Sequence, residues 1–84
     1  MASKFKTKVV KDFEKQGWTV ICVIRLSDNG YPDLILMRKG VTMWIEIKED
    51  GDTLKPLQKL RIDQLKQNGF EAYCLHATKG RIYG

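Results

Sequence analysis

With 84 residues, 43% hydrophobic and 30% charged, the chain has room for one small domain, and its composition excludes disorder. The net charge of +5 favours a polyanionic partner, although the basic residues are more scattered than clustered. No run is as long as a transmembrane helix and no apolar segment follows the basic N-terminus, so we expect a soluble, intracellular protein that does not associate with membranes.

The first predicted element is a helix over residues 3–16. Phe5, Val9 and Phe13 recur every four residues and form an apolar stripe along it. Gly17 supplies the end of the helix. The pattern therefore predicts a helix that packs one face on a core.

Three strands are predicted next. Residues 18–26 are dense in β-branched and aromatic side chains and predict a strand buried on most of its surface. Residues 33–38 and 41–48 follow as strands. Lys39-Gly40 is short enough to make these two strands an antiparallel hairpin.

The C-terminal half predicts one helix and one or two strands. Residues 49–52 form a polar loop, and a helix over 56–68 begins at a proline. Residues 70–76 predict a strand, and 81–83 a short edge strand. The order α-β-β-β-α-β favours an α/β fold, a small mixed sheet flanked by helices.

The two cysteines do not resemble a metal site. Cys22 and Cys74 each lie in an apolar run outside any C-x-x-C pair, and His76 adds no zinc-ligand spacing. We expect two buried free thiols in a reducing compartment, with neither a structural zinc nor an organic cofactor.

Alternation along residues 41–48 gives the sharpest local prediction. One face is uniformly apolar and must meet helices: Val41, Met43, Ile45 and Ile47. The opposite face presents Glu46 and Lys48 roughly 7 Å apart. Asp33 begins the preceding strand, so the hairpin brings its side chain to the same patch.

These side chains suit chemistry on a phosphodiester. Hard cations such as Mg²⁺ or Mn²⁺ take carboxylate oxygens, which Asp33 and Glu46 offer, and the backbone carbonyl of Ile47 is a further ligand candidate. Lys48 is placed to hold a water or neutralise the transition state. The alternative for E-x-K is an exposed ion pair, and P-D at a turn is common. Together, at hairpin spacing, they favour a site.

Gln58 is a candidate partner of this site. On a helix it lies close to the direction of Leu65, on the inward side with Leu57 and Ile62. A polar side chain there needs a partner, which the carboxylates can supply. A glutamine that bonds a free backbone N–H at the helix start is the alternative, and both remain open.

The basic residues fall into two groups. Five are candidate phosphate contacts near the predicted site: Arg25, Arg38, Lys55, Lys59 and Arg61. Five lysines spread around the first helix and predict a solvated face: Lys4, Lys6, Lys8, Lys11 and Lys15.

The ordered series of motifs resembles a known nuclease family. Gly30-Tyr31-Pro32-Asp33, Trp44-Ile45-Glu46-Ile47-Lys48, Asp52-Thr53-Leu54 and Gln58 are similar to the VRR-NUC domain of the PD-(D/E)XK superfamily, in its small stand-alone viral form. The resemblance covers roughly residues 30–76 and implies a restriction-endonuclease-like core.

The same resemblance implies an activity. It implies a divalent-metal-dependent, structure-specific endonuclease for branched DNA such as Holliday junctions, acting as a homodimer in the cytoplasm, that of the host if a phage encodes it. Asp33 and Glu46 would be metal ligands, Lys48 the catalytic lysine, and Gln58 a helper that contacts the water or the phosphate.

One position departs from the family pattern. The family places a further glutamate near the start of the first helix, where this chain reads Ser3-Lys4-Phe5-Lys6. Glu14 borders the apolar stripe and is a candidate substitute ligand, with a solvated surface glutamate as the alternative. The missing acid keeps a competing hypothesis open, a non-catalytic, basic nucleic-acid-binding module. Nothing in the motifs favours a third class, a small interaction protein.

Overall fold

The protein is described here from a computed structural model, which covers residues 4–24, 26–49, 51–77 and 81–83. Its elements are α1 (Lys4–Lys15), β1 (Thr19–Cys22), β2 (Leu34–Arg38), β3 (Val41–Lys48), α2 (Pro56–Gln67), β4 (Glu71–His76) and β5 (Arg81–Tyr83). The predicted order of elements is confirmed, including the short last strand, and nearly all predicted boundaries agree with the structure to within one residue.

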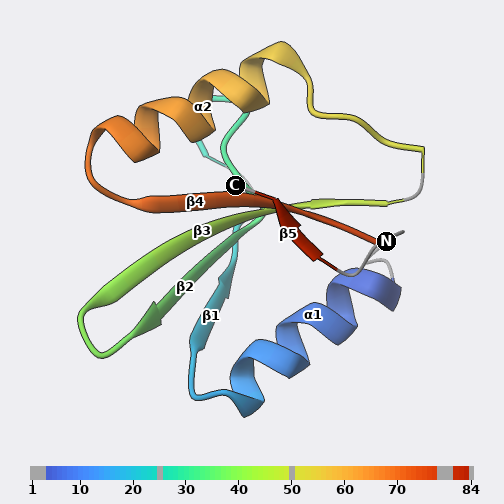
Figure 1. Cartoon of the computed structure of the whole chain (residues 1–84), viewed down its shortest axis with the longest axis vertical. Helices are drawn as coiled ribbons and strands as arrows, with labels where there is room; N and C mark the ends of the chain where they lie inside the picture. Colours follow the sequence, from blue (N-terminus) through green and yellow to red (C-terminus); the bar gives the residue numbers. More distant parts are fainter. Residues whose placement is uncertain (1–3, 25, 50, 78–80, 84) are drawn as a thin grey trace.

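The strands form one mixed sheet in the order β1-β2-β3-β4-β5. All neighbours are antiparallel except β3 and β4, which run parallel because α2 carries the chain back across the sheet. Figure 1 shows α1 on one face of the sheet and α2 on the other. No helix in the described ranges is long and apolar enough to cross a membrane.

Each helix packs on its own apolar cluster. On the α1 face, Val9 and Phe13 bury against sheet residues that include Leu36 and Ile45. The predicted apolar face of β3 therefore meets a helix. On the α2 face, Ile62 packs near Trp44.

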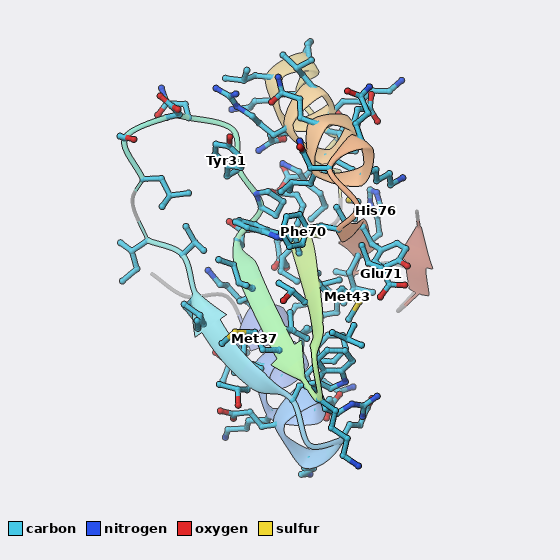
Figure 2. All side chains as sticks on the ribbon, turned by 90° about the vertical axis from the view of Figure 1, so that its left-hand side faces the viewer. Tyr31, Met37, Met43, Phe70, Glu71 and His76 are labelled. Atoms are coloured by element: carbon cyan, nitrogen blue, oxygen red, sulfur yellow. The ribbon has the colours of Figure 1, made fainter. Side chains whose placement is uncertain are left out.

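Packing on the α2 face also involves the loop before β2. Tyr31, in that loop, lies 6.0 Å from the Trp44 ring, and Figure 2 shows it on the side of α2. The Trp44 indole nitrogen is buried without a hydrogen-bond partner among the described residues. Trp44 thus packs within the fold, between Tyr31 and α2.

The hairpin between β2 and β3 is confirmed, with a two-residue turn. Lys39 and Gly40 both have positive φ, 47° and 81°, which is the backbone of the tight turns that suit twisted strands. Its register pairs Leu34 with Ile45.

The prediction for residues 18–26 is wrong in two respects. The strand spans only Thr19–Cys22, and it is mostly exposed, because β1 is the edge of the sheet and hydrogen-bonds only to β2. Ile24, beyond its end, is 95% exposed. Of the two cysteines predicted to be buried, Cys74 is buried and Cys22 is exposed on this edge.

Candidate active site

The hairpin places Asp33 opposite Glu46. Asp33 directly precedes β2, and the pairing of Leu34 with Ile45 continues by one residue in the antiparallel register. Pro32 is fully buried, so the backbone that enters β2 is fixed in place. Glu46 and Lys48 follow on β3, on the face that α2 covers.

Three contacts join the site residues. The Asp33 carboxylate accepts a hydrogen bond from the backbone N–H of Ile47, with 3.0 Å between Oδ2 and N. The Lys48 Nζ lies 3.5 Å from Glu46 Oε2. Gln58 Nε2 donates to the same oxygen at 3.5 Å. Asp33, Glu46, Lys48 and Gln58 are therefore brought together, as the sequence predicted.

The two charged β3 side chains are buried, unlike those of an ordinary surface ion pair. Glu46 is 4% exposed and Lys48 is 7% exposed. Burying charge is costly unless it is compensated, and one lysine faces two carboxylates here. The simple alternative for E-x-K, an exposed ion pair on a strand, is therefore wrong.

The pKa of Glu46 is raised by its surroundings. Burial and the neighbouring charge of Asp33 raise its pKa to about 7, and Lys48 only partly offsets them. Two adjoining carboxylates that resist being charged together are a donor set that a divalent cation would neutralise. The residues present thus fit a hard cation with oxygen ligands.

The Ile47 carbonyl is aimed at the same place. In an extended strand the N–H and C=O of one residue point to the same edge. The Ile47 N–H points to Asp33, and Lys48, the next residue, turns its carbonyl the other way, to the Ala77 N–H at 2.8 Å. The Ile47 carbonyl therefore faces the Asp33 side, where a third oxygen ligand would be needed.

A cavity of about 320 Å³ opens beside Asp33. It is lined by Asp33 and by the loop between β1 and β2, residues 23, 24 and 26–31. Of the two carboxylates, Asp33 lines this cavity and Glu46 does not, so the cavity gives a phosphate group access to the Asp33 side of the site.

Glu14 does not join the carboxylates. It is exposed on α1, whose buried residues pack on the sheet face opposite Glu46. In the described part of the chain no three His, Cys, Asp or Glu side chains are grouped to hold a metal. Of the two readings of Glu14, the structure agrees with the solvated surface glutamate and not with the substitute ligand, so the described residues bring two carboxylates to the site.

Gln58 combines the two roles that the sequence left open. Its Oε1 accepts the backbone N–H of Lys55 at 2.9 Å, which satisfies a free donor at the start of α2. Its Nε2 reaches Glu46. Leu57, which was expected to face inward, is 40% exposed, because it lies over Gly30 in the loop and not over the sheet.

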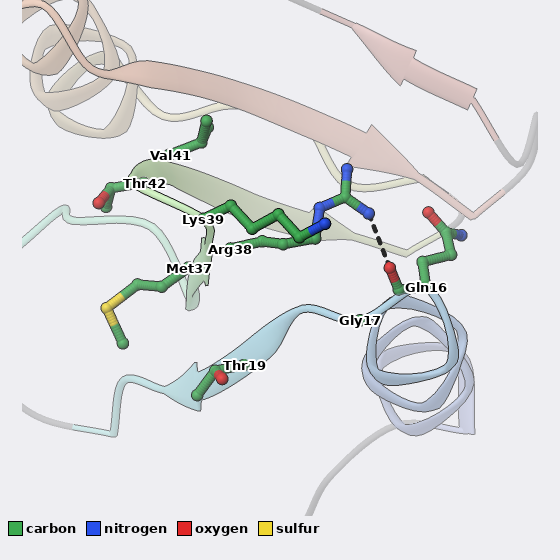
Figure 3. Close-up of a pocket in the computed structure, with 9 residues that line it drawn as sticks. Gln16, Gly17, Thr19, Met37, Arg38, Lys39, Val41 and Thr42 are labelled. Atoms are coloured by element: carbon green, nitrogen blue, oxygen red, sulfur yellow. Dashed lines mark hydrogen bonds between the residues drawn. The ribbon is translucent and has the colours of Figure 1, made fainter.

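Arg38 is at the wrong end of β2 to serve the site. Five residues of strand separate it from Asp33, about 16 Å. Its Nη1 donates to the Gln16 carbonyl at 2.7 Å, as Figure 3 shows, and its guanidinium lies 4.3 Å from the centre of the Trp18 ring. Arg38 joins the hairpin to the end of α1, and the prediction that it lies near the carboxylates is wrong.

Three other basic candidates lie nearer to the carboxylates than Arg38 does. Arg61 donates from Nε to the Asn29 carbonyl at 2.9 Å and lies 4.8 Å from the centre of the Tyr31 ring, so it holds the loop against α2. Lys55 and Lys59 are exposed at the start of α2 beside Gln58. Arg25 lies outside the described residues.

Sequence reasoning missed the neighbours that β4 supplies. The parallel register sets Cys74 beside Glu46 and His76 beside Lys48. Burial, followed by the charge of Glu46, raises the pKa of the Cys74 thiol, which keeps it neutral. Apolar patterning predicts a strand over residues 70–76 but carries no signal for its register.

Comparison with known proteins identifies relatives. A family model described as the VRR-NUC domain matches residues 3–79. No curated protein matches the chain. A solved VRR_NUC domain shares 20% identity, covering 90% of this chain and 84% of its own, with a TM-score of 0.79.

Two further structures are similar. Hjc, a Holliday junction resolvase from the archaeon Archaeoglobus fulgidus, shares 18% identity, covering 89% of this chain and 67% of its own, with a TM-score of 0.69. A VRR_NUC domain protein shares 30% identity, covering 86% of this chain and 55% of its own, with a TM-score of 0.56. The expected restriction-endonuclease-like fold is confirmed.

Proposed function

Because the chain belongs to the VRR-NUC nuclease family, we propose that it is a divalent-metal-dependent endonuclease that hydrolyses phosphodiester bonds in branched DNA. One observation carries the proposal. Asp33 and Glu46 interact across the hairpin, Lys48 lies beside Glu46, and a cavity lined by the loop opens at Asp33.

Asp33, Glu46 and the Ile47 carbonyl would hold the cation, Mg²⁺ or Mn²⁺. When bound, such a cation lowers the pKa of a water and offsets the charge on the leaving oxygen. Asp33 is pre-oriented by the Ile47 N–H, so one ligand is in place before the cation binds. Glu46 must lose its proton to bind a cation, and the raised pKa makes this step sensitive to pH near neutrality.

Lys48 supplies the positive charge of the reaction. Its ammonium is buried beside Glu46, so it has little water to screen it. There it would position the attacking water and stabilise the charge that gathers on the phosphate. Gln58 would keep the Glu46 carboxylate in one orientation through its Nε2, while its Oε1 accepts the Lys55 N–H and holds the side chain at the start of α2.

Branched DNA is proposed as the substrate, with a homodimer as the active form and the cytoplasm as its place. Cutting a junction symmetrically needs two sites. The exposed apolar residues around edge strand β1, Ile21, Ile24, Leu26 and Met37, support a contact between two copies. Light scattering of the purified protein, with Ile21→Asp as the disrupting variant, tests the dimer.

The test of the function compares Lys48→Ala with the wild type on labelled four-way and linear DNA in Mg²⁺ or Mn²⁺. We expect cleavage to fall by at least about 100-fold while DNA binding persists. Lys66→Ala is the matched control, because Lys66 is an exposed lysine near the far end of α2. Undiminished cutting by Lys48→Ala would contradict the proposal.

The presence of only two carboxylates favours one second candidate, a DNA-binding module without catalysis. That function requires salt-dependent DNA binding with no cleavage at any metal concentration. Titration of Mn²⁺ separates the two, because a nuclease site binds the ion and Glu46→Gln removes that binding.

A further inference from the structure

Four lysines of α1 share one side of the helix. At 100° per residue, Lys4, Lys8, Lys11 and Lys15 fall within about 60° of the circumference. We call these four the lysine stripe. Of the five lysines that were expected to spread around the helix, only Lys6 lies elsewhere, so the expected spread is wrong, whereas the expected solvent exposure of the other four is confirmed.

The lysine stripe is exposed and points away from the sheet. All four residues are exposed, while Val9 and Phe13 bury the opposite side of α1 in the core. In residues 4–24, 26–49, 51–77 and 81–83, none of the four has an ion pair or hydrogen bond through its ammonium group. The acids of the helix, Asp12 and Glu14, lie outside the stripe, one on each side.

Folding does not account for this arrangement. Lysines three and four residues apart repel one another and weaken the helix, and Lys4 places a positive charge at the unfavourable end of the helix dipole. A bound anion from another molecule would offset this repulsion, which makes the stripe a candidate binding surface.

The dimensions suit DNA. From Lys4 to Lys15 the stripe is about 16 Å long, because a helix rises about 1.5 Å per residue. One DNA strand carries a phosphate for about every 3.4 Å of helix axis, so the stripe runs beside about five base pairs. Four free ammonium groups match such a backbone in charge and in length.

The stripe faces away from the active site. α1 packs on the sheet face opposite Glu46 and Lys48, and Figure 1 shows the sheet between α1 and α2. Phe5, near the start of α1, shares a cavity with Leu75, which is in register with Ile47. The N-terminal end of the stripe therefore lies at the same end of the sheet as the site, but its charge is on the opposite face of the sheet.

DNA held at the carboxylates therefore cannot lie along the stripe without passing around the protein, whose extents are 34 × 29 × 23 Å. A second arm of a branched molecule can. We propose that the lysine stripe binds the phosphate backbone of a second arm of branched DNA and so gives the protein its preference for branched over linear substrates. This inference rests on the proposed function.

The test measures binding in excess chelator, so that no strand is cut. The double variant Lys8→Gln/Lys11→Gln removes two stripe charges. Lys39→Gln/Lys66→Gln removes two exposed charges elsewhere and is the matched control. Each protein is titrated with a four-way junction and with a linear duplex over a range of salt, after circular dichroism has shown equal helix content and melting temperature.

We expect the stripe variant to lose roughly fivefold in junction affinity for each lysine at 0.15 M salt, and its salt slope for the junction to fall by about two. Affinity for the linear duplex should change much less, and the control should bind the junction like the wild type. An unchanged junction slope overturns the proposal, and so does an equal loss in both variants, which would indicate overall charge alone.

Acidic lipid is the competing partner for such a stripe. If the stripe variant loses binding to phosphatidylserine vesicles and keeps the wild-type junction slope, the surface is a lipid contact and the proposal is overturned. This binding test can fail independently of the test of the proposed nuclease function. Absence of cleavage with metal would contradict the proposed function, whereas the binding slopes would still report on the stripe.

Discussion

Asp33 Oδ2 accepts the backbone N–H of Ile47 at 3.0 Å, so one carboxylate of the site is fixed by the backbone of the strand that carries the other. This hydrogen bond joins the two chain segments at the open end of the hairpin. It holds Asp33 next to Glu46 although two negative charges repel there. This relationship supports the proposal that a cation completes the site.

Replacing Asp33 by Asn tests this reading. The amide keeps an oxygen to accept the Ile47 N–H and loses the charge, so we expect the fold to persist and Mn²⁺ binding to weaken by at least about tenfold. Isothermal titration with Mn²⁺ measures it. Asp52→Asn, in the exposed loop before α2, is the control. Equal Mn²⁺ affinity in Asp33→Asn and wild type would remove Asp33 from the site.

The stability of the metal-free protein should fall as the pH rises from about 4.5 to about 7. The pKa of Glu46 is raised in the folded state, so the folded protein binds its proton more tightly than the unfolded chain does. The contribution is complete below the unfolded pKa and is lost as the pH passes the folded value. Its size is up to about 3 kcal/mol.

Urea unfolding between pH 4 and 8, in chelator, measures this dependence. Glu46→Gln should lack the fall, because its amide is neutral throughout, and the exposed Glu14→Gln should keep it. Parallel pH profiles for the wild type and Glu46→Gln would show that Glu46 does not titrate in this range.

The two roles of Gln58 can be separated. Gln58→Ala should lower the free energy of unfolding by about 1 kcal/mol, because the Lys55 N–H loses its acceptor, and the cleavage rate by about 10-fold, because Glu46 loses a partner. Adding Lys55→Ser supplies a new helix cap. We expect the double variant to regain stability and not activity, as measured by thermal melts and cleavage rates. Recovery of both would assign Gln58 a capping role alone.

Gly30→Ala should damage the loop that leads to Asp33. Gly30 has a φ of +88°, and an added Cβ would lie 2.7 Å from Leu57 Cγ at the start of α2. The backbone strain alone costs about 1–2 kcal/mol. Thermal melts should show a clear loss, of which Leu57→Ala, by removing the clash, recovers only a part. A wild-type melting temperature for Gly30→Ala would contradict this view of the loop.

The hairpin and its site were predictable because their signals are local. Lys39-Gly40 fixes the turn, alternation fixes which way Glu46 and Lys48 point, and Asp33 follows from the register. The grouping of the lysine stripe was also available from the sequence, since the same 100° spacing that placed Gln58 places Lys8 and Lys11 on one side.

Other features depend on tertiary contacts that the sequence does not encode locally. The exposure of Cys22 follows from the edge position of β1, which depends on the order of strands in the sheet. The placement of Cys74 beside Glu46 follows from a parallel register set by the length and packing of α2. The separation of Arg38 from Asp33 is different, because five positions along one strand already place the two at opposite ends of it.

The most direct test of the central claim is single-turnover cleavage of a labelled four-way DNA junction by the wild-type protein, as Mn²⁺ is added and then withdrawn with excess chelator. The account predicts cutting that rises to saturation with Mn²⁺ and stops in chelator. Undiminished cutting in chelator would contradict it, as would a junction that binds and remains intact at every Mn²⁺ and Mg²⁺ concentration.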